Sequence, residues 1–241
     1  MQPDALSVIE ACRRHKVRVV VFDGDHKLSG DLAWELWRDG VELYAPELSP
    51  RPLYSKLMYP SFPANIKTGN RPVTIGYVGN NYERYDQAVR LLGGPSGPEC
   101  HFWGDWIEGR VNRESKAKVM ADFPNSVFHG VLPEPLVHKT LETMMATIHL
   151  AKASYCATGF ITMRWAEAAA AGVLAFIPSE FAMPLVDRGI FPTASNVSEL
   201  NDLLAAYSDY RARSPLLTQQ SNWVHDNMRM TEWLRVLGPK R

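Results

Sequence analysis

Apolar residues along the chain fall into two alternating patterns: short runs rich in β-branched residues, and stretches with helical spacing. The runs occupy 17–22, 41–45, 73–78, 100–103 and 173–177. Near-continuous apolar runs of this length are typical of strands that are covered on both faces. The stretches between them have helical periodicity, and several end at a glycine. Strands that alternate with helices in this way predict an α/β fold with parallel sheets.

Six prolines interrupt this alternation between residues 46 and 72. Proline excludes both a long helix and a central strand, so this stretch is interpreted as a linker between two units. We therefore expect a short first unit with its linker over 1–71 and a larger α/β unit over 72–217. A closing helix is expected over 218–241, packed back on the first unit through Trp223 and Trp233.

Two predicted elements of the second unit are inferred only from the positions of apolar residues. Leu141, Met145 and Ile148 have helical spacing, which predicts a helix over 135–152. The next apolar residues predict a strand over 154–157, and loops that follow strands are where parallel sheets bind ligands.

Composition narrows the class of protein. Hydrophobic residues make up 46% of the 241 residues and charged residues 22%, which excludes disordered, collagenous and coiled-coil proteins. The 26 basic and 26 acidic residues balance, which argues against broad non-specific binding to nucleic acid or to anionic membranes. Three distant cysteines and the lack of a long apolar run favour a cytoplasmic protein without a membrane span.

The most specific stretch is 158–178, TGFITMRWAEAAAAGVLAFIP. Arg164 and Glu167 are three residues apart, so they share one face at the start of a predicted helix. The alanines that follow allow this helix to lie close to a sheet, and a helix N-terminus at the end of a strand can bind an anion. The alternative interpretation is an ordinary Arg–Glu pair on a helix surface.

This stretch resembles the nucleotide-sugar-binding segment of GT-B glycosyltransferases. The likeness is to the spore-maturation-type family, with R-x-x-E-x-x-A-x-G before an apolar strand, here Arg164, Glu167, Ala170, Gly172 and VLAFIP. The resemblance implies two Rossmann-like parallel-sheet units in a compact GT-B-like arrangement. It also implies that the Glu167 carboxylate binds the donor ribose and that basic residues bind the diphosphate. The residues expected to bind the donor are Gly79, Asn80, Asn81, Gly159, Phe160, Arg164 and Glu167.

The sequence departs from the family pattern at two points. Many retaining members have an E-x7-E motif, but the residue eight positions before Glu167 is Gly159. The first unit is also shorter than a usual acceptor domain. A non-catalytic nucleotide-binding GT-B-like module is therefore the alternative function. The resemblance also implies transfer without a metal ion or other cofactor, and the histidines and cysteines have no metal-ligand spacing.

The segment Asp23-Gly24-Asp25-His26 follows the first strand. Asp23, Asp25 and His26 are candidate catalytic residues, because a carboxylate or imidazole facing the cleft can take a proton from an acceptor hydroxyl. A strand that ends in Asp-x-Asp also resembles the nucleophile motif of haloacid-dehalogenase phosphatases. A simple turn explains the same residues.

The sequence therefore predicts a hexosyltransferase that uses a nucleotide sugar, with UDP-hexose as the expected donor. The acceptor is a hydroxyl group, and the candidates are a glycan, a small molecule or a hydroxymethylated DNA base. A basic strip at Arg13, Arg14, His15, Lys16 and Arg18 is consistent with contact to DNA phosphates, or equally with a solvated helix end.

Overall fold

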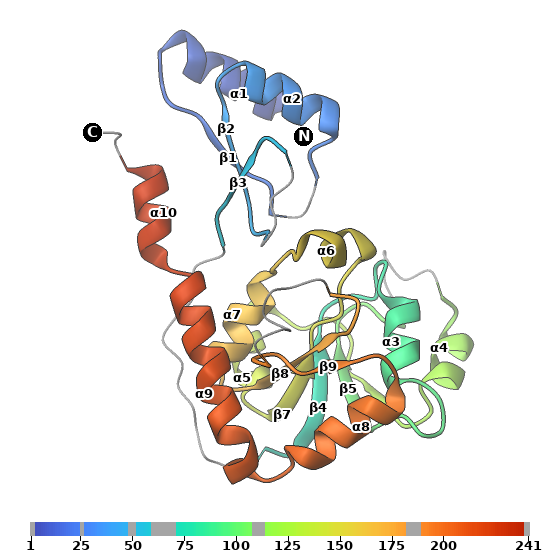
Figure 1. The fold of residues 1–241 in the computed structure, drawn as a ribbon. Helices are drawn as coiled ribbons and strands as arrows, with labels where there is room; N and C mark the ends of the chain where they lie inside the picture. The colour runs from blue at the N-terminus through green and yellow to red at the C-terminus, as the bar shows by residue number, and fades with distance from the viewer. Residues whose placement is uncertain are drawn as a thin grey trace.

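A computed structural model describes residues 3–24, 27–47, 52–58, 71–107, 114–181 and 189–238, and it contains two parallel β-sheets, one in each unit (Figure 1). The predicted α/β class with two Rossmann-like units is confirmed. The first sheet has three strands in the order β1 (Val20–Phe22), β2 (Glu42–Ala45) and β3 (Tyr54–Lys56).

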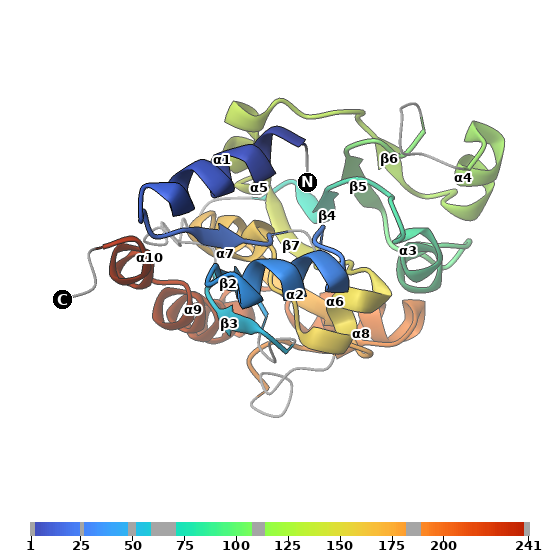
Figure 2. The ribbon, with the colours of Figure 1, turned by 90° about the horizontal axis from the view of Figure 1, so that it is seen from above.

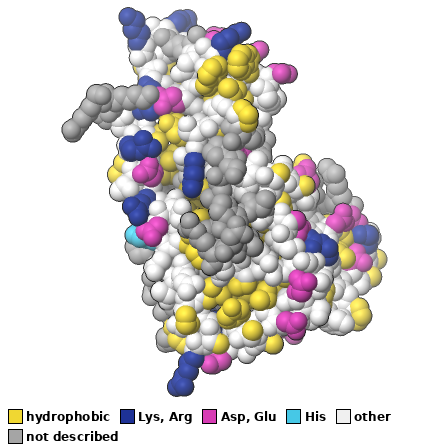
Figure 3. All heavy atoms as spheres, in the orientation of Figure 1, with side chains coloured by type: hydrophobic (Ala, Val, Ile, Leu, Met, Phe, Trp, Pro, Cys, Tyr) yellow, Lys and Arg dark blue, Asp and Glu magenta, His cyan; other side chains and the backbone are white. Residues whose placement is uncertain are grey.

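Two helices, α1 (Pro3–Arg14) and α2 (Gly30–Arg38), lie side by side on this small sheet (Figures 1 and 2). Ser29 begins α2, because its side chain accepts a hydrogen bond from the backbone N–H of Leu32. The core of the unit is small, and its buried residues are Ala33, Leu36, Val41 and Leu43. Trp34 and Trp37 of α2 stay about half exposed. Hydrophobic side chains gather on the surface of the first unit in Figure 3.

The second sheet has six strands in the order β6-β5-β4-β7-β8-β9, and neighbouring strands run parallel. The strands are β4 (Val73–Val78), β5 (Cys100–Trp103), β6 (Val127–Phe128), β7 (Met144–Ile148), β8 (Leu174–Pro178) and β9 (Thr193–Ala194). From β4 the chain builds outward through β5 and β6 and then returns to β7 on the other side. The carboxyl ends of β4 and β7 therefore border the crevice where parallel sheets of this order bind ligands.

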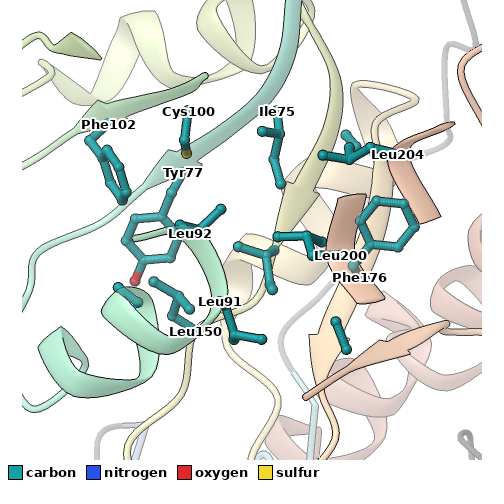
Figure 4. Close-up of a cluster of buried hydrophobic side chains, with 14 of the residues drawn as sticks. Ile75, Tyr77, Leu91, Leu92, Cys100, Phe102, Leu150, Phe176, Leu200 and Leu204 are labelled. Atoms are coloured by element: carbon teal, nitrogen blue, oxygen red, sulfur yellow. The ribbon is translucent and has the colours of Figure 1, made fainter. Parts of the chain in front are cut away.

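Helices cover both faces of this sheet. They are α3 (Tyr85–Leu92), α4 (Lys116–Asp122), α5 (Val137–Leu141, after the short 3-10 helix Glu134–Leu136), α6 (Ala153–Thr158), α7 (Met163–Ala170), α8 (Val197–Ala206) and α9 (Tyr210–Asn227). On one face, Phe176 of β8 packs with Leu92 and Leu200 from α3 and α8 (Figure 4). On the other, Ala175 and Ile177 of the same strand pack with residues of α7 and α9.

The structure corrects the two predictions that were inferred only from the positions of apolar residues. The expected helix over 135–152 is wrong beyond Leu141, because Met144–Ile148 forms β7 in the centre of the sheet. A strand buried on both faces has no polar side, so apolar positions at helical spacing occur in it by chance. The expected strand over 154–157 is also wrong, because Ala153–Thr158 forms helix α6.

The closing helix is divided into two. Helix α9 ends at Asn227, and α10 (Met230–Leu237) follows after a short break and runs beside the first unit (Figure 1). Trp233 of α10 contacts that unit: its ring meets Phe22 edge-on at 4.9 Å, and its indole N–H donates to the Met58 carbonyl oxygen at 2.6 Å. Trp223 lies instead within the second unit, against Trp165 and Phe191.

Among the described residues, none of the helices combines the length and apolar character that crossing a membrane requires.

Candidate active site

A cavity of about 460 Å³ lies between the two units, at the carboxyl ends of the central strands of the large sheet. We call this cavity the cleft. Val78 at the end of β4 and Ile148 at the end of β7 line it from below, and Gly24 and Lys27 line it from the first unit. Its place at the point where the strand order reverses is where open α/β sheets bind ligands.

The cleft is positively charged. The cationic residues that line it are Lys27, Arg84, Lys152 and Arg164, and none of the described lining residues is Asp or Glu. Like charges that border one hollow raise the local potential and attract an anion. A group with two or more negative charges, such as a diphosphate, fits this set of side chains.

Two of these cations are held by backbone oxygens and aromatic rings. Arg84 donates from Nε to the Leu150 carbonyl oxygen at 3.3 Å and from Nη1 to the Tyr82 carbonyl oxygen at 3.0 Å. The Lys152 ammonium lies 4.5 Å from the ring centre of Tyr82 and 5.3 Å from that of Tyr155. The Lys152 ammonium also lies 3.8 Å from Oε2 of the half-exposed Glu83. Arg84 is thus oriented by uncharged groups, whereas Glu83 offsets part of the charge of Lys152.

The N-terminus of α7 opens into the same cleft. Thr162, Met163 and Arg164 line the cavity. The Thr162 side chain makes no capping hydrogen bond, and the first turn of α7 contains no acidic residue. The first backbone N–H groups of a helix have no intrahelical partners, so a helix start at the cleft is a place where an anion can bind.

Arg164 is paired with Glu167 one turn along α7. Its other terminal nitrogen lies 3.8 Å from an Oε2 oxygen of Glu134. Only Arg164 of this pair is among the residues that line the cleft. The structure thus brings the two expected donor-binding residues together, with the Glu167 carboxylate holding the guanidinium at the cleft.

The loop after β4 is close to its expected place. Gly79 and Asn80 line the cleft, whereas Asn81 is buried beside a smaller pocket. The Asn80 side-chain oxygen accepts the backbone N–H of Asp105 at 2.9 Å, so it fixes a neighbouring loop. A Cβ atom at Gly79 would lie 2.7 Å from the Tyr77 hydroxyl, which explains glycine at this turn.

Gly159 and Phe160 lie between α6 and α7. Gly159 ends α6 in the left-handed region, at φ 64°, where glycine is favoured. Phe160 is buried and stacks on Tyr155 at 4.2 Å, although it also borders the cleft. In this structure both residues shape the wall of the cleft.

Asp23 is buried at the end of β1. Its Oδ1 accepts the backbone N–H of Lys27 at 2.7 Å, and its Oδ2 accepts the Tyr54 hydroxyl at 3.3 Å. These contacts anchor the loop that carries Gly24 and Lys27 into the cleft. Asp25 and His26, the other candidate catalytic residues, lie outside the described residues.

Sequence reasoning missed His149 and Lys152, which follow β7 and line the cleft. The cause is the helix assigned to 135–152: with a strand at 144–148, the rule that ligands bind after strands would have selected both residues. His149 is buried with its ring stacked on Trp165 at 4.5 Å, and burial lowers the pKa of its imidazole to about 3.

Two parallel-sheet units with a cleft between them form a GT-B-like fold. Similar solved structures include T4 phage beta-glucosyltransferase (BGT), with 16% sequence identity, a TM-score of 0.61 and coverage of 96% of this chain and 78% of that one. A complex of T4 phage BGT with UDP-glucose matches at 16% identity and a TM-score of 0.61, over 91% of this chain and 63% of that one. WaaG, a glycosyltransferase of lipopolysaccharide biosynthesis, matches at 12% identity and a TM-score of 0.54, over 96% and 81% of the two chains.

These likenesses establish the fold. The chain spans 63% to 78% of the length of the beta-glucosyltransferase chains that it matches. No protein-family model and no curated protein sequence matches it. The GT-B part of the sequence resemblance is thereby supported, whereas the spore-maturation-type motif stays a resemblance.

The expectation that no metal ion takes part is corrected by another T4 phage BGT structure, which contains UDP together with Mn²⁺. In the described ranges, no group of three or more His, Cys, Asp or Glu side chains is placed to hold a metal. These residues therefore do not form a metal cage of their own. Divalent ions in nucleotide sites are often held largely by phosphate oxygens and water, which requires few protein ligands.

Proposed function

We propose that this protein is a glycosyltransferase that moves a hexose from a UDP-sugar to an acceptor hydroxyl. The observation that carries the proposal is the cationic cleft at the reversal of strand order, between two parallel-sheet units. The fold is shared with glycosyltransferases, one of which is a T4 phage enzyme in complex with its UDP-glucose substrate. A diphosphate is the part of such a donor that a cleft of this charge would select.

In this proposal the diphosphate lies at the N-terminus of α7. Arg164 binds a phosphate oxygen pair through its planar guanidinium, and Lys152 and Arg84 add positive charge from the loops after β7 and β4. Charge of this sign also stabilises UDP as the bond to the sugar breaks, which favours the transition state over the bound donor. Glu167, next to Arg164, accepts hydrogen bonds from the ribose hydroxyls.

The acceptor approaches from the first unit. The loop anchored by Asp23 faces the second unit across the cleft, with Lys27 in the lining. Asp23, Asp25 and His26 are the candidates for the base that takes the hydroxyl proton as the acceptor oxygen attacks the anomeric carbon. The oxygen–carbon bond forms, the bond from that carbon to the diphosphate oxygen breaks, and UDP leaves with the electron pair.

The acceptor class stays open between a glycan, a small molecule and a hydroxymethylated DNA base. One similar structure, a beta-glucosyltransferase, is described as a DNA-modifying enzyme. This chain has no net charge, which favours a glycan or small molecule because binding to duplex DNA gains most of its strength from phosphate contacts.

The test combines thermal stability with turnover. UDP, UDP-glucose and other nucleotide sugars are added to the purified protein, each with Mn²⁺ and with EDTA. A ligand that binds only the folded state raises the free energy of unfolding by RT ln(1 + [L]/Kd). UDP release in the presence of an acceptor supports transfer. Binding without release favours the non-catalytic module, and a protein that no nucleotide stabilises contradicts the proposal.

A further inference from the structure

His149 directly follows β7 and lines the cleft. The residue is 7% exposed, and its backbone N–H donates to the Phe176 carbonyl oxygen at 2.9 Å, which fixes its position on the sheet. Its ring is parallel to the indole of Trp165, with 13° between the planes. Backbone and ring are therefore both held in place before any ligand binds.

The imidazole lacks one hydrogen bond. Its Nε2 is buried and has no hydrogen-bond partner among the described residues. Buried polar atoms in folded proteins nearly always have partners, because an unpaired one has lost its hydrogen bonds to water without replacement. His149 also lines the cleft, so a molecule bound there can supply the missing partner.

The chemistry of His149 differs from that of the other polar groups in the cleft. Burial keeps the imidazole neutral at physiological pH, with a pKa of about 3. A neutral imidazole has one nitrogen that donates and one that accepts, which suits a hydroxyl group better than a phosphate. The cations around it suit the phosphates.

The helix geometry places His149 on the sugar side of the proposed donor. Trp165 and Glu167 are two residues apart in α7, so their side chains point about 200° apart around the helix axis. Arg164 lies between these two directions. With the ribose at Glu167 and the diphosphate at Arg164, the ring stacked on Trp165 lies beyond the diphosphate, where the hexose begins.

We propose that His149 hydrogen-bonds a hydroxyl group of the hexose in the donor and so contributes to the choice of sugar. This inference rests on the proposed function. It assigns to His149 a contact with the transferred group and none with the nucleotide.

The test compares two ligands in matched variants. His149→Phe keeps a ring on Trp165 and removes both nitrogens. His129→Phe is the control, because the His129 ring also stacks on a tryptophan, Trp103, at 4.4 Å, but His129 is exposed, is hydrogen-bonded to His101 and does not line the cleft. Titration calorimetry measures the Kd of UDP and of UDP-glucose, or of whichever UDP-hexose wild type binds most tightly.

The expected result is a selective loss. In His149→Phe the Kd of the UDP-hexose rises roughly 3- to 10-fold, the range of one net hydrogen bond, and the Kd of UDP changes less than twofold. The unliganded variant should melt no lower than wild type, because an unpaired buried nitrogen is removed. His129→Phe should change neither Kd.

Three outcomes overturn the inference. Unchanged UDP-hexose affinity in His149→Phe means that His149 only packs on Trp165. An equal loss for UDP and UDP-hexose places the contact on the nucleotide. Wild type that binds no UDP overturns the inference together with the proposed function on which it rests, and the wild-type titration distinguishes this failure from the other two. If His149→Phe does not fold, His149→Gln provides the same comparison, with hydrogen bonding retained and the ring removed: it should keep more UDP-hexose affinity than His149→Ala.

Discussion

Replacing Glu167 by alanine tests the donor site most directly. The carboxylate pairs with Arg164 at the cleft, and its side chain is 20% exposed. In the proposed complex it accepts hydrogen bonds from ribose hydroxyls, and the loss of a hydrogen bond to a charged group costs about 1.5–3 kcal/mol. The Kd of UDP should therefore rise roughly ten- to a hundredfold. The unliganded protein should lose less than about 1 kcal/mol of stability, because a partly exposed ion pair contributes little.

Glu167→Ala can weaken UDP binding in a second way. Removing the carboxylate also breaks its ion pair with Arg164, so the guanidinium is no longer held at the cleft. Uridine, which lacks phosphates, separates the two routes: a direct ribose contact weakens uridine and UDP alike, whereas an effect through Arg164 weakens UDP alone. Calorimetric titration of both ligands measures this difference.

The control is Glu232→Ala, which breaks an exposed pair of the same i,i+3 spacing with Arg235 on α10. Wild-type affinity for UDP in Glu167→Ala would refute the assignment of the donor site. A similar loss in the control would show that the effect is not local to the cleft.

Further predictions concern the first unit and pH. Asp23→Asn should lower turnover ~10²–10⁴-fold with donor affinity nearly unchanged if Asp23 is the base; full turnover, measured as UDP release, excludes this role. Trp233→Ala should lower the free energy of unfolding by up to ~3 kcal/mol, because the contacts to Phe22 and Met58 are lost; an unchanged urea midpoint contradicts the packing argument. The pKa of His149 is about 3 in the folded state and ordinarily about 6.5. Below pH 6.5 the unfolded chain binds the proton first, so stability falls by up to ~1.4 kcal/mol per pH unit toward pH 3, and His149→Phe should reduce this slope in urea titrations at pH 7, 5 and 4.

Much of the fold could be predicted from local patterns. The runs at 73–78 and 173–177 form β4 and β8, because runs of buried apolar residues of this length belong to strands of a covered sheet. The segment at Arg164 was placed correctly at the start of a helix that follows the central strands. Terminal glycines and apolar residues at helical spacing were enough to predict helices that have one polar face.

The central strand β7 shows where such reasoning stops. Its burial depends on β4 and β8 on either side, which lie far away in the sequence, and no local pattern distinguishes it from a buried helix. This one error hid His149 and Lys152, which follow the strand. Arg84 was missed for another reason: its direction is set by the carbonyl oxygen of Leu150, which lies 66 residues away in the sequence.

The first unit depends on the end of the chain. A three-stranded sheet with a core as small as Ala33, Leu36, Val41 and Leu43 gains little stability alone. Helix α10 supplies what is lacking, because Arg18 donates to the carbonyl oxygens of Val236 and Gly238 at 2.5 and 3.1 Å. These are the free oxygens at a helix C-terminus, where a cation is favoured. The sheet that precedes the loop with Gly24 and Lys27 is thus tied to the last helix of the chain. In the proposed function, the donor binds to the second unit and the acceptor hydroxyl is activated from the first, so the two steps would depend on different parts of the molecule.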